Sequence, residues 1–181
     1  MSVKHSYNSK FYNFCGEVEK IFGVPQGELH NLHELRSDLM PKDKLNFDKG
    51  ASIKAIYEAF IRTIIAPMFE KSFVYQAFPS FRVHIPNDQA VHKWHHDSDE
   101  NHNHPEWEIN FQVALTKMWD SNAMWLESVP GLGDFKPVEM EVGDYTIFYG
   151  NKCAHGNKQN KTGKTRVSMD FRVLPYDKYD E

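Results

Sequence analysis

The sequence has few cysteines and no long apolar run. Its two cysteines, Cys15 and Cys153, exclude a disulfide framework and a cysteine-based zinc finger. No apolar stretch is long enough to span a bilayer, and the opening residues MSVKHSYNSK lack the apolar core of a secretory signal. These absences predict a protein of the reducing cytoplasm that has no membrane partner.

A surplus of positive charge is also missing. The chain carries 21 Lys and Arg residues against 25 Asp and Glu residues, so no basic field points to a nucleic-acid partner. No repeat or low-complexity tract interrupts the 181 residues, a length that usually forms one domain with a sizeable core. We therefore predict a single domain over residues 1–181 and a small-molecule partner. The composition does not indicate an oligomeric state.

Helical patterning is confined to residues 1–72. Residues 11–22 predict a short helix, and residues 28–35 predict another turn or two. The clearest helix covers residues 52–66, with Ser52 as its N-cap. Its apolar side chains recur at the spacing of one helix face, at Ile53, Ile56, Tyr57, Phe60 and Ile64. This pattern predicts a helix packed against a sheet.

Short strands replace helices over residues 73–176. The predicted strands are Phe73–Phe78, Phe81–Ile85, Glu108–Thr116, Ala123–Glu127, Val138–Val142, Tyr145–Tyr149 and Thr165–Val173. Turn residues separate them and no helical pattern intervenes, which is typical of an antiparallel sandwich or barrel. We therefore predict a mainly β protein, in which N-terminal helices form a layer packed on a C-terminal jelly roll.

A candidate metal site combines three side chains from two parts of the chain. Alternate residues of a strand share a face, so His95 and Asp97 aim at one point while Trp94 and His96 point away. His155 follows an apolar strand and a turn, a suitable place for a third ligand at a barrel mouth. Two imidazoles and one carboxylate form a facial triad, which leaves positions open on Fe(II) for a cosubstrate and O₂.

The strand TRVSMDFRV supplies a candidate carboxylate site. Its polar side chains share one face, at Arg166, Ser168, Asp170 and Arg172. Burying such a row is costly unless each group has a partner, so either the strand lies at an exposed edge or the row faces a pocket. In the second case the planar guanidinium of Arg166 holds a carboxylate, and the Ser168 hydroxyl donates to the same group.

The ordered pattern His-x-Asp, His, Arg-x-Ser resembles the Fe(II)/2-oxoglutarate-dependent oxygenases, and more narrowly the StrG-like group associated with streptomycin-type biosynthetic clusters. The stretches HHDSD, EINFQVALT, SNAMWLESVPGLGDFKPVE and TRVSMDFRV carry the resemblance, all within residues 95–173. One departure is Val113-Ala114, near which the group's pattern has a proline.

The resemblance implies a double-stranded β-helix, iron held by His95, Asp97 and His155, and 2-oxoglutarate held by Arg166 and Ser168. It implies hydroxylation of a small polar metabolite of the amino-sugar or amino-acid type, with release of succinate and CO₂. Related halogenases lack the carboxylate ligand, so the presence of Asp97 favours hydroxylation or another oxidation.

Other polar and aromatic residues have two readings each. Gln76, Arg82 and Asn110 lie on strands expected to line the barrel, where each either contacts 2-oxoglutarate or substrate or is a structural polar group. His92 is a candidate outer neighbour of the metal or a rival ligand. The three tryptophans that either line a substrate pocket or belong to the core are Trp94, Trp107 and Trp125.

Two alternative functions remain open. His102, His104 and Glu108, followed by His155, mimic the metal motif of cupin-type enzymes. That assignment leaves Arg166 and Ser168 unexplained, and the first histidines lie in a polar segment more like a lid than a strand. A non-enzymatic jelly-roll module that binds sugars is the other alternative, since the aromatic content of 14% permits it.

Overall fold

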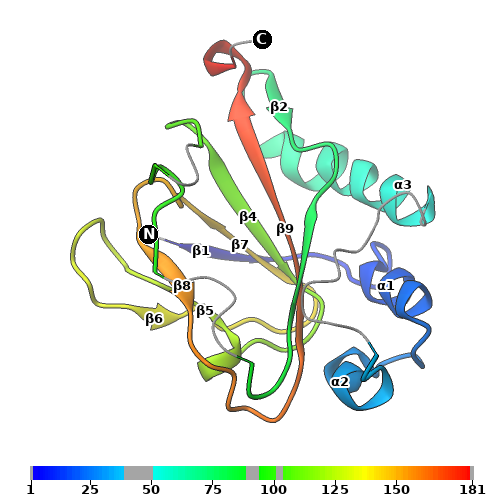
Figure 1. Ribbon diagram of the computed structural model, residues 1–181. Coiled ribbons are helices and arrows are strands. Elements are labelled where there is room, and N and C mark those ends of the chain that lie inside the picture. Colours follow the sequence, from blue (N-terminus) through cyan, green and yellow to red (C-terminus); the bar gives the residue numbers. More distant parts are fainter. Residues whose placement is uncertain (1, 39–50, 89–93, 101–103, 180–181) are drawn as a thin grey trace.

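The computed structural model describes residues 2–38, 51–88, 94–100 and 104–179. Within them the chain forms two antiparallel sheets, and helices cover the side of the larger sheet that faces away from the smaller one (Figure 1). The larger sheet contains, in spatial order, β1 (Val3–Ser6), β7 (Asp144–Phe148), β4 (Ile109–Ala114), β9 (Arg166–Pro175) and β2 (Phe73–Tyr75), and β3 (Ser80–His84) also pairs with β9. The smaller sheet contains β6 (Lys136–Pro137), β5 (Met124–Leu126) and β8 (His155–Asn157). The predicted mainly β, antiparallel architecture is confirmed.

The helices belong to the N-terminal part of the chain. They are α1 (Phe14–Phe22), α2 (Leu32–Leu35) and α3 (Ala51–Phe60), which continues as a π-helical turn, Ile61–Ile65, and a 3₁₀ turn, Ala66–Met68. Further 3₁₀ turns cover Leu29–Asn31, Asp120–Asn122 and Tyr176–Lys178. No helix among the described residues combines the length and the apolar character that crossing a bilayer requires.

The helix ends differ from two sequence predictions. α1 begins at Phe14 rather than at residue 11, because the Asn13 side chain accepts a hydrogen bond from the Gly16 N–H at 3.0 Å and caps the first turn. Ser52 lies inside α3 and is not its N-cap. Its hydroxyl donates instead to the Glu17 carboxylate, which joins α3 to α1.

The strand predictions fail at the most irregular places. β1 was not predicted, because VKHS is short and polar and becomes a strand by pairing with β7. β8 was not predicted either, because HGN is short and polar and becomes a strand by pairing with β5. The predicted strand 138–142 is wrong, because this segment forms only one isolated bridge among the described residues, between Met140 and Met118, and one hydrogen bond from the Val138 N–H to the Met124 carbonyl.

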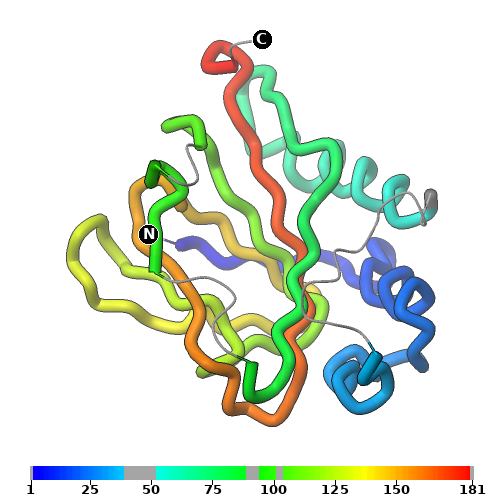
Figure 2. Tube along the Cα trace, in the orientation of Figure 1, coloured from blue at the N-terminus to red at the C-terminus, as the bar shows by residue number. Residues whose placement is uncertain are grey.

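β9 lies in the middle of the larger sheet. It pairs with β4 on one side and with β2 and β3 on the other, which Figure 2 shows as the C-terminal segment running between two earlier segments of chain. The alternative of an exposed edge strand is therefore wrong. The polar face of β9 is directed toward the space between the two sheets, and its apolar face packs on the helical side.

One apolar cluster joins the helices to the larger sheet. Phe60 of α3 is fully buried and makes edge contacts with Tyr145 of β7 and Phe171 of β9. Phe171 in turn stacks on Phe111 of β4, with ring centroids 4.9 Å apart. The side of the sheet opposite the site is therefore filled by large apolar side chains, which support β4 and β9 from behind.

A single hydroxyl links α3 to the end of β2. The fully buried Tyr57 donates to the Gln76 carbonyl oxygen at 2.7 Å. Tyr57→Phe is expected to lower the free energy of unfolding by about 0.5–1.5 kcal/mol, because the carbonyl loses its partner while the ring still fills its place. Denaturant titration measures this. Tyr149→Phe, at a half-exposed position, is the control, and equal losses in the two variants would contradict the assignment.

Candidate metal centre

The three predicted ligands come together at one edge of the smaller sheet. His155 begins β8, and His95 forms an isolated antiparallel bridge with it, through backbone hydrogen bonds of 3.0 Å in both directions. Asp97 follows in a turn, and its N–H donates to the Gly150 carbonyl at 2.9 Å. The predicted strand through His95 and Asp97 is therefore reduced to one bridge, although the alternation argument selected the same two side chains.

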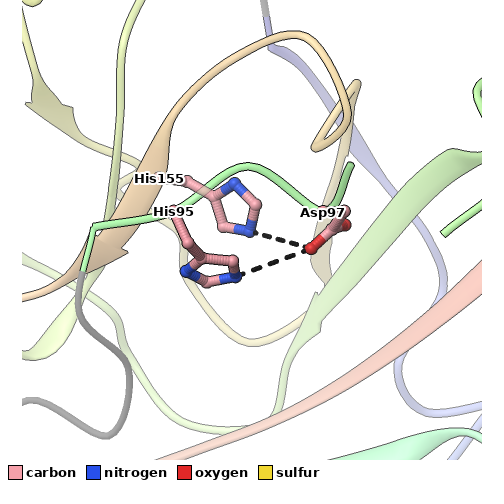
Figure 3. A group of neighbouring side chains, drawn as sticks. All are labelled: His95, Asp97 and His155. Carbon is pink, nitrogen blue, oxygen red and sulfur yellow. Dashed lines mark ion pairs between the residues drawn. The ribbon is translucent and has the colours of Figure 1, made fainter. Parts of the chain in front are cut away.

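The side chains converge on a single point (Figure 3). The Asp97 Oδ1 atom lies 3.5 Å from His95 Nε2 and 3.6 Å from His155 Nε2. The three candidate ligand atoms all lie within 4.8 Å of one another. Within the described part of the chain this is the one group of three or more such residues arranged to hold a metal ion, and two nitrogens with one oxygen leave further coordination positions open.

The imidazole of His155 is prepared for metal binding. It is buried, and its Nδ1 lies 3.1 Å from the Cys153 carbonyl oxygen, so Nδ1–H donates there and the Nε2 lone pair faces Asp97. Burial lowers the pKa of His155, which favours the neutral imidazole. A neutral ring with a fixed tautomer is the form that binds a metal ion.

The Asp97 carboxylate is held in its ionised form. Burial by itself would raise its pKa, but hydrogen bonds from His95 and Asn110 and the nearby charge of Arg172 together lower it well below its usual range. Asp97 is 2% exposed, so this negative charge has little water around it. A buried carboxylate next to two imidazoles is a strong attractor for a divalent cation.

A partly open cavity of about 90 Å³ extends from this triad between the two sheets. Its walls combine side chains of the larger sheet with those of the smaller one. They are Arg82, His95, Asp97, Asn110, Gln112, Met124, Phe148, His155, Gly156, Asn157, Arg166, Asp170, Phe171 and Arg172. The cavity therefore brings Arg82, Asn110 and Arg166, which were selected from the sequence, into one space with the triad.

Arg166 is the most unusual group in this wall. It is 2% exposed, and its side chain makes no hydrogen bond or ion pair with any described residue; its Nε is buried without a partner. Burial lowers its pKa to about 10. Ser168, on the same side of β9, is fully buried, and its hydroxyl also lacks a partner among the described residues. A buried cation beside an unused hydroxyl is the arrangement expected of an anion site without its anion.

The other sequence candidates separate into two groups. Arg82 lines the cavity but is ion-paired with Asp170, at 2.9 Å and 3.3 Å. Asn110 also lines the cavity, with its amide directed at Asp97. Gln76 does not line it: β2 ends at Tyr75, and the Gln76 amide donates to the Phe78 carbonyl at 2.7 Å.

A second, open hollow of about 750 Å³ lies beside the cavity. Its walls include Gln76, His104, Glu108 and Lys178. Arg172 lines both this hollow and the cavity. His104 and Glu108, two members of the cupin-like set, form an ion pair at 3.1 Å here and do not join the metal cluster. The remaining histidine of that set, His102, and the proposed rival ligand His92 lie outside the described residues.

The tryptophans are not part of the cavity wall. Trp94 packs on Phe135, with centroids 4.2 Å apart, and Trp125 donates its indole N–H to the Asp120 carbonyl. Trp107 is half-exposed and lies near two lysine side chains. None of the three is buried, so none belongs to the core.

Sequence reasoning missed Glu127. This buried carboxylate follows β5 and accepts hydrogen bonds from the Ala154 N–H at 2.6 Å and the Gly133 N–H at 3.2 Å. The bond from Ala154 holds the pKa of Glu127 below its usual range. Glu127 thereby fixes the residue before His155. The signal in the sequence was an acidic residue directly after the apolar run AMWL.

Comparisons with known proteins find similarities to this chain in sequence and in fold. No family model matches it. It is 34% identical over 140 residues to the streptomycin biosynthesis protein StrG of Streptomyces griseus, a match that spans 77% of this chain and 65% of StrG.

Solved structures share the fold at low sequence identity. HygX from Streptomyces hygroscopicus, solved with nickel and 2-oxoglutarate bound, superposes with a TM-score of 0.63 at 12% identity, over 97% of this chain and 82% of that one. EctD from S. alaskensis, solved with 2-oxoglutarate and 5-hydroxyectoine, superposes with a TM-score of 0.66 at 10% identity, over 99% and 74%. The chain has the fold of these proteins.

Proposed function

We propose that the chain is an Fe(II)- and 2-oxoglutarate-dependent oxygenase of the StrG-like group, with the metal held by His95, Asp97 and His155. One observation carries the proposal: the wholly buried Arg166 has no partner among the described residues and lines a cavity that also reaches the triad. The similarity to StrG supports the narrower grouping. In this proposal the two sheets and the N-terminal helices form a double-stranded β-helix with a helical layer packed on it.

The residues present fit both groups. Two imidazole nitrogens and a carboxylate oxygen form the donor set of a facial triad, which suits non-haem iron. Arg166 and Ser168 offer a charged fork and a hydroxyl, which suit the distal carboxylate of a keto acid. HygX and EctD, which share the fold, were both solved with 2-oxoglutarate.

Iron and 2-oxoglutarate, when bound, supply the oxidation of the substrate by O₂, with succinate and CO₂ as coproducts. The protein supplies position and environment. The triad would hold the metal by three donor atoms, which leaves further coordination positions for the cosubstrate and O₂. Arg166 and Ser168 would orient 2-oxoglutarate from its far end, because both lie on the side of β9 that faces the space between the two sheets.

The second hollow is the proposed place of the primary substrate. It is open, adjoins the cavity through Arg172, and its walls include Gln76, Glu108 and Lys178. Such walls suit a small polar metabolite of the amino-sugar or amino-acid type. We propose hydroxylation of such a molecule in the cytoplasm, without a nucleic-acid or membrane partner.

Turnover tests this proposal. The protein is expected to form succinate from 2-oxoglutarate only when Fe(II) and O₂ are both supplied. The assay needs no primary substrate, because the slow conversion of 2-oxoglutarate to succinate without it is sufficient for detection. His95→Ala is expected to lose metal and turnover together, because it removes one donor of the triad. His104→Ala, which removes the ion pair with Glu108 and no member of the triad, is the matched control and is expected to keep both metal and turnover. If His104→Ala loses the metal and His95→Ala keeps it, the cupin-type assignment is favoured. If no variant and no wild-type sample forms succinate in an oxygen-dependent way, the sugar-binding module is favoured.

A further inference from the structure

The amide of Asn110 uses both of its ends next to the proposed metal. Its Nδ2 donates to Asp97 Oδ2 at 2.7 Å, and its Oδ1 accepts from the Gly150 N–H at 2.9 Å. Because a backbone N–H can only donate, the Gly150 bond fixes which end of the amide is the oxygen. The Asn110 N–H group must therefore face Asp97.

Gly150, Asn110 and Asp97 form a closed ring of three hydrogen bonds. The Asp97 N–H donates to the Gly150 carbonyl at 2.9 Å, and the Gly150 N–H donates to Asn110. A β-carbon at residue 150 would collide with the Asp97 carboxylate and would lie 3.0 Å from the Asn110 oxygen. The turn after β7 can thus approach Asp97 only because residue 150 is a glycine.

The ring distinguishes the two oxygens of Asp97. Oδ2 is held by Asn110, whereas Oδ1 is the atom that lies 3.5 Å and 3.6 Å from the Nε2 atoms of His95 and His155. A carboxylate held this way presents one oxygen to an ion between the histidines. Binding through both oxygens would occupy one of the positions that a keto acid and O₂ require.

We infer that Asn110 is a positioning residue, which holds Asp97 Oδ2 so that Oδ1 faces the metal. The inference rests on the proposed function, because it takes the triad as the metal site. It gives Asn110 a role other than contact with 2-oxoglutarate or substrate. Partners of this kind typically contribute about 10–100-fold in metal affinity, since they fix the ligand before the metal arrives.

The test is the Mn²⁺ affinity of the metal-free protein, measured by equilibrium dialysis. Asn110→Leu keeps the size of the side chain and removes both amide contacts, so its dissociation constant is expected to rise about 10–100-fold. Gln112→Leu is the matched control: Gln112 lies on the same side of β4 and lines the same cavity, but makes no hydrogen bond with Asp97. It is expected to bind Mn²⁺ as wild type does.

The melting temperature of the metal-free variants separates positioning from a structural role. If Asn110→Leu melts earlier but binds Mn²⁺ as tightly as wild type, Asn110 is only structural and the inference fails. If the leucine variant does not fold, Asn110→Ser replaces it. Its Mn²⁺ dissociation constant is expected to rise in the same way, and an unchanged constant would refute the inference. A wild-type protein that binds no Mn²⁺ would overturn the proposed function as well, whereas equal binding by wild type and the Asn110 variants would overturn the positioning role alone.

Discussion

Asp97→Ala is expected to weaken metal binding by more than about 100-fold. Changing a residue that only holds a ligand in place typically weakens metal binding by roughly 10–100-fold. Asp97 is the only carboxylate of the cluster, and its Oδ1 lies between the two imidazoles. Its removal leaves two neutral donors, which bind a hard divalent cation weakly. Equilibrium dialysis with Mn²⁺ measures the loss.

Asp99→Ala is the control for this experiment. Asp99 lies close in sequence and accepts a hydrogen bond from the His96 N–H at 3.0 Å, but it is not part of the cluster. It is expected to keep the wild-type affinity. Equal losses in Asp97→Ala and Asp99→Ala would show that general negative charge, and not the triad, attracts the ion.

Arg166→Met is expected to weaken 2-oxoglutarate binding strongly while it makes the protein without ligand more stable. Loss of one partner of a buried charge pair costs about 2–5 kcal/mol, or roughly 30-fold to several thousand-fold in affinity. Without 2-oxoglutarate the guanidinium is buried and has no partner among the described residues, so replacing it by an apolar chain removes an unfavourable desolvation. Binding isotherms for 2-oxoglutarate and thermal unfolding measure the two effects.

Arg82→Met is the contrasting variant. Arg82 lines the same cavity, but its charge is matched by Asp170 at 2.9 Å. Its removal leaves a carboxylate in the cavity wall without its cation, so Arg82→Met is expected to lower stability. If both arginine variants shift the melting temperature in the same direction, the ion pair that Arg82 has and Arg166 lacks does not explain their effects on stability. A 2-oxoglutarate affinity that is unchanged in Arg166→Met would remove Arg166 from the cosubstrate site.

Periodicity predicted the regular elements because their pattern is set by one buried face. α3 has apolar residues at helical spacing, and β9 alternates between a polar and an apolar face. β1 and β8 have no such pattern, since VKHS and HGN are short and polar and become strands only by pairing with distant chain. Gln76 was placed with the barrel lining because the end of β2 at Tyr75 has no sequence signal.

The candidate ligands could be selected from the sequence because metal binding requires specific residue types. His95, Asp97 and His155 come together as the alternation and order of these residues predict. Their supports could not be selected in the same way. Asn110 and Gly150 contact Asp97 only because β4 and the end of β7 lie side by side, a tertiary arrangement that neither segment encodes alone.

The most direct test of the proposed function is anaerobic addition of Fe(II) and 2-oxoglutarate to the purified protein, followed by visible spectroscopy. A keto acid chelated to Fe(II) gives a metal-to-ligand charge-transfer band. The wild-type protein is expected to show this band only when both components are present, and Asp97→Ala and Arg166→Met are expected to show none at the same concentrations. A folded wild-type protein without the band would contradict the assignment of the triad and of Arg166 together.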